Sequence, residues 1–541
     1  MRLRIATALL VTALAAAVPL SAQAHDAYEA SSASEAFAAY FADGTSDGLL
    51  GMQALADPHP LTGEGSNMEL VANVPLEGSV AASDLELQGD YAYVGSYGEG
   101  LVIIDIANPR EPKRVSRFYC PGGQNDVQLS PDASYAVLAV ENPNNKCGEG
   151  IPGQPKHAGD EGFVVIDIRD KTNPKEVAWV GQDQLVDGVH NVTLDWPRLY
   201  IDQYTQTHGR FEIFDLSNPA QPRSIAKLAA PEGGPHDLQV DHRPDGRVLA
   251  YAASIAFTHV LDVTDPTNPT FVDRIPASEH GVGISHGAEP NFDRTLMVET
   301  DEYGGGNGVV ACGGRVEQIP APTDGQVATA SPGAVHLIRL NPDGTLKEVG
   351  GKVDQVGAYN TPAATTDTGD EGCTSHVFWQ APDENRLTIA WYGRGVRVVD
   401  FSKPEAPVEL GYFKATGADT WSAKPHKGYI FAGDIVRGLD VFRYTGEDCK
   451  RWPTTAGAAE VQRARYQGAP VPAGAPAKVP GGCGAAATNA PAVPLSATPG
   501  PATKDAAAEF GGYRFMRVVK VKRRGGKRRR TVRLQILDPE G

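Results

Sequence analysis

Short apolar runs recur through the middle of this chain, and each ends in an aspartate followed by a turn. In one copy, residues 101–104 precede Asp105, and Asn108-Pro109 follow after two intervening residues. Proline fixes its own φ and the Asn side chain bonds nearby backbone amides, so the pair predicts a turn after a buried strand. Further copies end at Asp167, Asp215, Asp262 and Asp400, and weaker ones cover 335–340 and 438–442.

The spacing of these copies indicates the architecture. The aspartates at 105, 167, 215 and 262 are 62, 48 and 47 residues apart, which is close to the length of one four-stranded propeller blade. Within one unit, alternation predicts strands at 236–241, 247–253, 258–263 and 270–275. Seven units fit into residues 74–447, so we predict an all-β, seven-bladed β-propeller.

The run Leu101-Val102-Ile103-Ile104-Asp105 and its copies resemble the LVIVD repeat of exported and cell-surface proteins of bacteria and archaea. The resemblance extends over nearly the whole of residues 74–447. It implies a propeller scaffold and a surface location. It implies no activity, because a fold does not determine a function.

Histidines recur in one phase at the start of consecutive units. The first strand of a blade is the innermost, so residues that open these strands should converge on the axis near one mouth of the channel. Four of the seven equivalent positions hold histidine, in a chain with 13 His. The positions are Ser83, Asn125, His190, His236, His286, His376 and Asp419 or Thr420.

Converging imidazoles suit a transition metal, Fe, Cu or Zn, better than Mg or Ca. The candidate ligands are His190, His236, His286 and His376. The alternative is that they only hydrogen-bond neighbouring strands, since a neutral imidazole is also an ordinary polar group. The remaining histidines of the repeats are interpreted as structural: His208, His242, His259, His336 and His426.

Polar residues near the candidate ligands have two interpretations. Asp237, Glu289, Asn191 and Asn125 either orient the imidazole rings or bond the strand ends. The acidic residues of 299–302, at the end of a second strand, either add carboxylates at the rim of the channel or lie at a solvated loop edge, which is the favoured interpretation. They are Glu299, Asp301 and Glu302.

The chain carries a net charge of -17, but the 11 Lys/Arg and 2 Asp/Glu of 514–541 give that tail +9 and leave -26 for the rest. An acidic body argues against nucleic acid as a partner. The tail, 513–541, is predicted as a basic hairpin around Gly525-Gly526 that binds an anionic surface polymer, a membrane surface or the acidic body of another copy, or as a disordered, solvated tail. Residues 448–512, rich in Ala, Pro and Gly, are expected to form a flexible linker.

The N-terminus indicates export. Residues 1–24 have the basic, apolar and small-residue zones of a signal peptide, and 25–73 are predicted as an irregular or partly helical leader. No later segment is apolar enough to span a bilayer. Six cysteines in an exported chain favour three disulfides, although fifteen connectivities exist. The nearest-neighbour pairing is Cys120 with Cys147, Cys312 with Cys373, and Cys449 with Cys483.

Two functions follow. The first is a metal-dependent oxidoreductase with a small-molecule ligand in the channel. The second is a non-catalytic cell-surface binding or adhesion scaffold. Two Gly/Pro-rich insertions, 142–160 and 304–333, are expected near the channel mouth.

Overall fold

The computed structural model describes residues 58–446 except 79–80, 123, 143, 186–187, 204–208, 304–332, 362–373 and 382–384. It also describes the backbone of three strands between 507 and 537. The chain divides into two compact units, Met1–Thr488 and Asn489–Gly541. The predicted signal peptide, the two other predicted disulfides and His208 lie outside the described residues.

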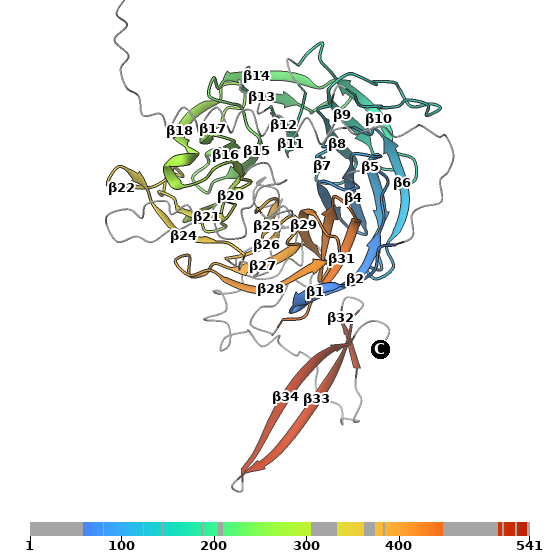
Figure 1. Ribbon diagram of the computed structural model, residues 1–541, viewed down its shortest axis with the longest axis vertical. Coiled ribbons are helices and arrows are strands. Elements are labelled where there is room, and N and C mark those ends of the chain that lie inside the picture. The colour runs from blue at the N-terminus through green and yellow to red at the C-terminus, as the bar shows by residue number, and fades with distance from the viewer. Residues whose placement is uncertain are drawn as a thin grey trace, which may run out of the picture. The chain divides into compact units, whose positions relative to one another are not determined.

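The first unit is a ring of seven antiparallel sheets around a central axis (Figure 1). This confirms the predicted all-β, seven-bladed propeller. In blade 4 the strands form in chain order from the inside outward, within one or two residues of the predicted bounds. They are β15 (Asp237–His242), β16 (Val248–Ser254), β17 (Phe257–Asp262) and β18 (Thr270–Pro276).

The other blades repeat this order. Blade 1 comprises β3 (Leu85–Gln88), β4 (Tyr91–Ser96), β5 (Gly100–Asp105) and β6 (Lys113–Tyr119). Blade 2 comprises β7 (Val127–Leu129), β8 (Tyr135–Val140), β9 (Gly162–Asp167) and β10 (Lys175–Val180). Blade 3 comprises β11 (Asn191–Asp195), β12 (Arg198–Asp202), β13 (Arg210–Asp215) and β14 (Arg223–Ala229).

Blade 5 follows the one-turn 3-10 helix η1 (Ala277–His280). It comprises β19 (Ser285–Pro290), β20 (Leu296–Asp301), β21 (Val335–Arg339) and β24 (Gln355–Tyr359), with the small hairpin β22 (Glu348–Val349) and β23 (Lys352–Val353) before its last strand. Blade 6 comprises β25 (Phe378–Gln380), β26 (Arg386–Ala390), β27 (Val396–Asp400) and β28 (Val408–Ala415). Blade 7 comprises β29 (Thr420–His426), β30 (Tyr429–Asp434) and β31 (Gly438–Tyr444).

The N-terminal segment closes the ring. β2 (Met68–Val74) pairs with β31 as the outer strand of blade 7, and β1 (Gly63–Ser66) adds a fifth strand to blade 6 beside β28. The sequence places these residues in an irregular leader before Val74, whereas the structure pairs them with the last two blades. Hydrogen bonds to strands more than 340 residues away create this order, and a local pattern does not contain them.

The aliphatic runs are the third strands, which are buried on both faces. In β5, Leu101 and Ile103 pack against blade 2, while Val102 and Ile104 pack against blade 7. A strand buried on both faces reads as a continuous apolar run because alternate side chains enter two different cores. The terminal Asp105 then turns the chain, since its Oδ1 accepts the Ala107 N–H at 2.9 Å.

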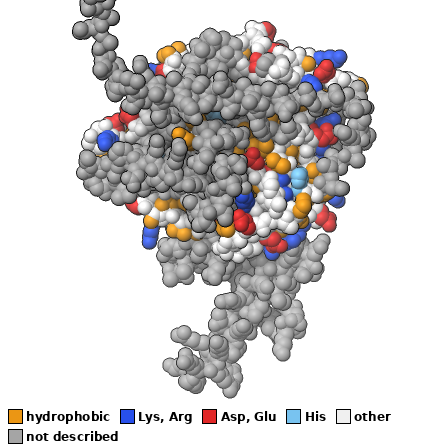
Figure 2. Space-filling view, in the orientation of Figure 1, with side chains coloured by type: hydrophobic (Ala, Val, Ile, Leu, Met, Phe, Trp, Pro, Cys, Tyr) orange, Lys and Arg blue, Asp and Glu red, His pale blue; other side chains and the backbone are white. Residues whose placement is uncertain are grey.

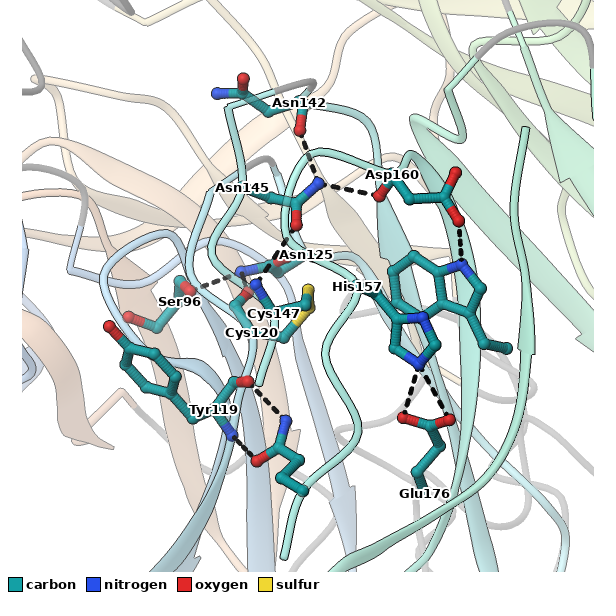
Figure 3. The surroundings of a disulfide bond; sticks show 12 residues. Ser96, Tyr119, Cys120, Asn125, Asn142, Asn145, Cys147, His157, Asp160 and Glu176 are labelled. Carbon is teal, nitrogen blue, oxygen red and sulfur yellow. Dashed lines mark hydrogen bonds and ion pairs between the residues drawn. A yellow bond between two sulfur atoms is a disulfide. The ribbon is translucent and has the colours of Figure 1, made fainter. Parts of the chain in front are cut away.

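Cys120 and Cys147 form the predicted disulfide, 27 residues apart (Figure 3). The bond joins the end of blade 1 to the insertion that interrupts blade 2. Within that insertion Asn145 Nδ2 donates to the Asn142 and Asp160 carbonyls, both at 2.8 Å. The described part of this insertion is therefore a cross-linked loop. Most of the second insertion, 304–332, lies outside the described residues.

The second unit contains β32 (Ala507–Phe510), β33 (Tyr513–Arg524) and β34 (Lys527–Leu537) in one antiparallel sheet. β33 and β34 flank Gly525-Gly526, as predicted, whereas β32 is a strand inside the predicted linker.

On the face of the propeller visible in Figure 2, acidic and basic side chains of the described residues are interspersed. In the described part of the chain, no helix is long and apolar enough to cross a membrane.

Candidate metal centre

The four histidines that open inner strands form an arc on the propeller axis. His190 and His236 immediately precede β11 and β15, His376 lies two residues before β25, and His286 lies in β19. Neighbouring ring centres are 4.2 Å apart for His190 and His236, 4.5 Å for His236 and His286, and 4.0 Å for His286 and His376. All four side chains are buried. Their common strand phase brings the rings together.

A carboxylate completes this arrangement. Ligand atoms of His236, His286 and Glu302 lie within 4.8 Å of one another. Glu302 Oε2 lies 3.8 Å from His286 Nε2, and its Oε1 lies 3.5 Å from His376 Nε2. Three ligand atoms about 2.1 Å from one tetrahedral ion are about 3.4 Å apart, so an approach of roughly 1 Å would suit the group to a metal.

The prediction of a solvated edge for Glu299, Asp301 and Glu302 was wrong, because all three are buried. In an antiparallel blade the second strand ends where the first strand begins. The chain leaving β20 therefore arrives at the same channel mouth as the histidines.

Fixed hydrogen bonds orient two of the rings. His376 Nδ1 donates to the Trp421 carbonyl at 2.7 Å, so its Nε2 carries the lone pair. His190 Nδ1 lies 2.5 Å from Glu141 Oε2, which favours the same tautomer. The Tyr392 hydroxyl donates to Glu302 Oε1 and holds that carboxyl beside the rings.

His286 differs from its neighbours. Among the described residues, neither of its ring nitrogens has a hydrogen-bond partner, although the side chain is 1% exposed. Buried polar groups in folded proteins are nearly always paired. The orphaned nitrogens therefore point to a ligand.

Burial controls the ionisation of the site. Desolvation, together with the neighbouring histidines, lowers the pKa of His236 and of His286 well below the ordinary value. Desolvation lowers the pKa of His376 to about 3. Desolvation also raises the pKa of Glu302 to about 7. Neutral imidazoles are the form that binds metals.

The predicted ring-orienting residues bond elsewhere. Asn191 Nδ2 donates to the His236 backbone carbonyl at 3.0 Å, and Asn125 Nδ2 donates to the Ser96 carbonyl at 2.5 Å. Asp237 and Glu289 line a cavity farther along the axis. Glu289 accepts a hydrogen bond from Gln380 at 3.2 Å.

The remaining ring positions also bond locally. The Ser83 hydroxyl donates to the Gln124 carbonyl, and Thr420 Oγ1 donates to Asp434 Oδ2 at 3.1 Å. The backbone N–H of Asp419 donates to the same Asp434 oxygen at 2.9 Å.

The site residues that sequence reasoning missed are Glu141, Tyr392 and Trp421. Glu141 and Tyr392 follow the second strands β8 and β26, as Glu302 follows β20. Polar residues just after second strands were thus the available signal. Trp421, by contrast, contributes a backbone carbonyl, which has no signal in the sequence.

The histidines interpreted as structural have ordinary partners. His242 Nε2 lies 2.9 Å from Asp195 Oδ1, and His259 Nε2 lies 3.0 Å from Glu232 Oε1. The remaining two contacts are His336 Nδ1 with Gln355 Nε2 at 2.9 Å and His426 Nε2 with the Gly89 carbonyl at 2.8 Å.

The LVIVD repeat profile matches residues 80–119 and 158–180, which lie in blades 1 and 2. No curated protein sequence matches the chain.

The chain is similar to several solved structures at low sequence identity. A protein of unknown function from Desulfotomaculum acetoxidans DSM 771 is 12% identical over 68% of this chain and 91% of its own, with a TM-score of 0.42. The WD40 β-propeller domain of Doa1 is 9% identical over 69% and 96%, with a TM-score of 0.44. A Lactobacillus plantarum protein is 11% identical over 65% and 86%, with a TM-score of 0.43.

Proposed function

The chain is an LVIVD-repeat β-propeller of seven blades, and we propose that it binds a transition-metal ion at the axial mouth of its channel. His236, His286 and Glu302 are the ligands, and His376 and His190 extend the arc on either side. The observation that carries the proposal is that the ligand atoms of His236, His286 and Glu302 lie within 4.8 Å of one another.

The chemistry of the donors supports Fe, Cu or Zn. Two histidines and one carboxylate form the ligand set of many non-haem iron and zinc enzymes. The low pKa values of the buried imidazoles keep their lone pairs available. A divalent ion would also offset the buried Glu302 carboxylate, whose side chain is 9% exposed.

We further propose that the site serves a metal-dependent oxidoreductase. A redox-active ion held by three protein ligands keeps coordination positions open for a substrate. The chain contributes neutral donors, a carboxylate held by the Tyr392 hydroxyl, and a buried environment. A non-catalytic binding scaffold has no need of four imidazoles gathered on its axis.

The test is metal stoichiometry. The purified protein is stripped with EDTA, reloaded separately with Fe(II), Cu(II), Zn(II) or Co(II), desalted and measured by ICP-MS. We expect one ion per chain in the wild type, and a Co(II) visible spectrum that changes on binding. His286→Ala and Glu302→Gln should each lose the ion, whereas His157→Ala, a partly exposed histidine paired with Glu176, should keep it.

Absence of stoichiometric metal from the wild type after reloading would overturn the proposal, as would equal retention in His286→Ala. Either result would leave the binding scaffold as the better account. If the wild type retains an ion that the variants lose, the identity of that ion determines the activity assays: redox assays for Fe or Cu, and hydrolytic assays for Zn.

We also propose that the protein is exported to the cell surface. The signal-peptide pattern of 1–24 and the disulfide of Cys120 and Cys147 support this, since disulfides persist in oxidising compartments. The basic segment 513–541 is proposed to bind an anionic surface polymer. Removing 513–541 should abolish salt-sensitive retention on an anionic resin, and unchanged retention would contradict this role.

A further inference from the structure

A second feature of the axis lies just beyond the histidines. A cavity of about 140 Å³ is lined by residues from all seven inner strands. Several of its lining residues follow directly after the arc, such as Asn191 after His190 and Asp237 after His236. A protein cavity of about 150 Å³ holds benzene, so this one suits a molecule of about six non-hydrogen atoms.

Its lining is strongly acidic. Six carboxyl side chains line the cavity against one ammonium, that of Lys424. Lys424 Nζ lies 3.0 Å from Glu86 Oε1 and 3.4 Å from Asp84 Oδ1, and Asp195 is already paired with His242. The cavity carboxyls without an ion pair among the described residues are Asp126, Asp237 and Glu289.

Two of these carboxyls are desolvated, with little compensation for their charge. Desolvation raises the pKa of Glu289 to about 8. Desolvation also raises the pKa of Asp126 well above its ordinary value, and the adjacent Asp84 adds to the effect. A buried carboxyl shifts in this direction when no cation offsets its charge.

An independent observation points to a donor ligand. Gln124 lines the cavity and is 3% exposed, and its Oε1 has no hydrogen-bond partner among the described residues. An ammonium group only donates hydrogen bonds. Phe378, Trp379 and Trp421 supply an aromatic wall, which attracts alkyl groups and cations.

We propose that this cavity binds a small aliphatic amine in its ammonium form, of about six non-hydrogen atoms. The carboxyl of Glu289 and the amide oxygen of Gln124 accept its hydrogen bonds, and its carbon chain lies against the aromatic wall. The cavity is built without the metal ligands, so this proposal stands independently of the proposed function.

The experiment is calorimetric titration of the full chain, kept in EDTA, with 1,4-diaminobutane. Its uncharged counterpart of equal length, 1,4-butanediol, is the matched probe. We expect the diamine to bind at one site and the diol to bind at least about tenfold more weakly, since a charge-assisted hydrogen bond contributes about one decade or more in affinity.

Glu289→Gln should weaken diamine binding by about tenfold, whereas Glu405→Gln, an exposed carboxyl in the same propeller, should leave it unchanged. No diamine binding by the wild type, or equal binding of diamine and diol, would overturn the proposal. The wild-type comparison decides the matter even if Glu289→Gln fails to fold. Metal stoichiometry is measured separately, so failure here leaves the metal proposal standing.

Discussion

Replacing His286 with leucine should stabilise the metal-free protein. A neutral imidazole carries one donor and one acceptor nitrogen, and in the described part of the chain both are buried without a hydrogen-bond partner. An unsatisfied buried polar group costs about 1–3 kcal/mol. Leucine has a similar volume and no polar atom, so His286→Leu should raise the free energy of unfolding by about 2 kcal/mol.

Bound metal should make the wild type at least as stable as His286→Leu. An ion at 100 times its Kd stabilises the native state by about 2.7 kcal/mol, and only the wild type retains the ligand. His286→Leu should therefore unfold at higher urea concentration than wild type in EDTA, but at lower or equal concentration in saturating metal. The assay is equilibrium urea unfolding followed by tryptophan fluorescence in both buffers.

His376→Leu is the matched control. It removes the hydrogen bond from Nδ1 to the Trp421 carbonyl, which offsets the gain, so its metal-free stability should change less than that of His286→Leu. A loss of more than about 1 kcal/mol in metal-free His286→Leu would refute the reasoning. It would mean that the imidazole stabilises the fold and that a structural role suffices.

Three further results are expected. Arg437→Met should cost about 3–5 kcal/mol because it leaves Asp440 buried and unpaired, and Arg437→Met/Asp440→Leu should recover most of that loss in urea unfolding. Burial lowers the pKa of His336 to about 4, so as the pH falls the unfolded chain binds a proton before the native protein does. This group should therefore lower the free energy of unfolding by up to about 3 kcal/mol between about pH 6.5 and pH 4. His336→Gln should make the free energy of unfolding depend less steeply on pH, and an unchanged dependence would contradict the reasoning. Cys120→Ala/Cys147→Ala should lower the unfolding free energy by about 3 kcal/mol in non-reducing buffer, and no difference from wild type would contradict the cross-link.

Arg437 illustrates what closes the ring. Its guanidinium donates to Asp440 at 2.7 and 3.1 Å, to the Thr416 carbonyl at 3.1 Å and to the Pro60 carbonyl at 3.2 Å. Asn73 in β2 donates to the same Asp440 at 2.8 Å. One buried ion pair thus ties the N-terminal strand to the last blade, which explains the large cost expected on breaking it.

The sequence by itself determined the repeating parts of this protein. The aliphatic runs fix the third strands because both faces of each are buried, as Leu101 and Val102 show by packing against different blades. The phase of His236 within its unit also fixed its place on the axis. Both features are periodic, and a property of one strand repeats wherever that strand repeats.

Only the tertiary structure decided which groups face the histidines. Glu302, Glu141 and Tyr392 follow second strands, and each reaches the channel mouth because its blade is antiparallel. Closure by β2 likewise depends on pairing with a strand more than 340 residues away. These contacts join segments that share no local pattern, and the burial that keeps the imidazoles neutral exists only once all seven blades surround the axis.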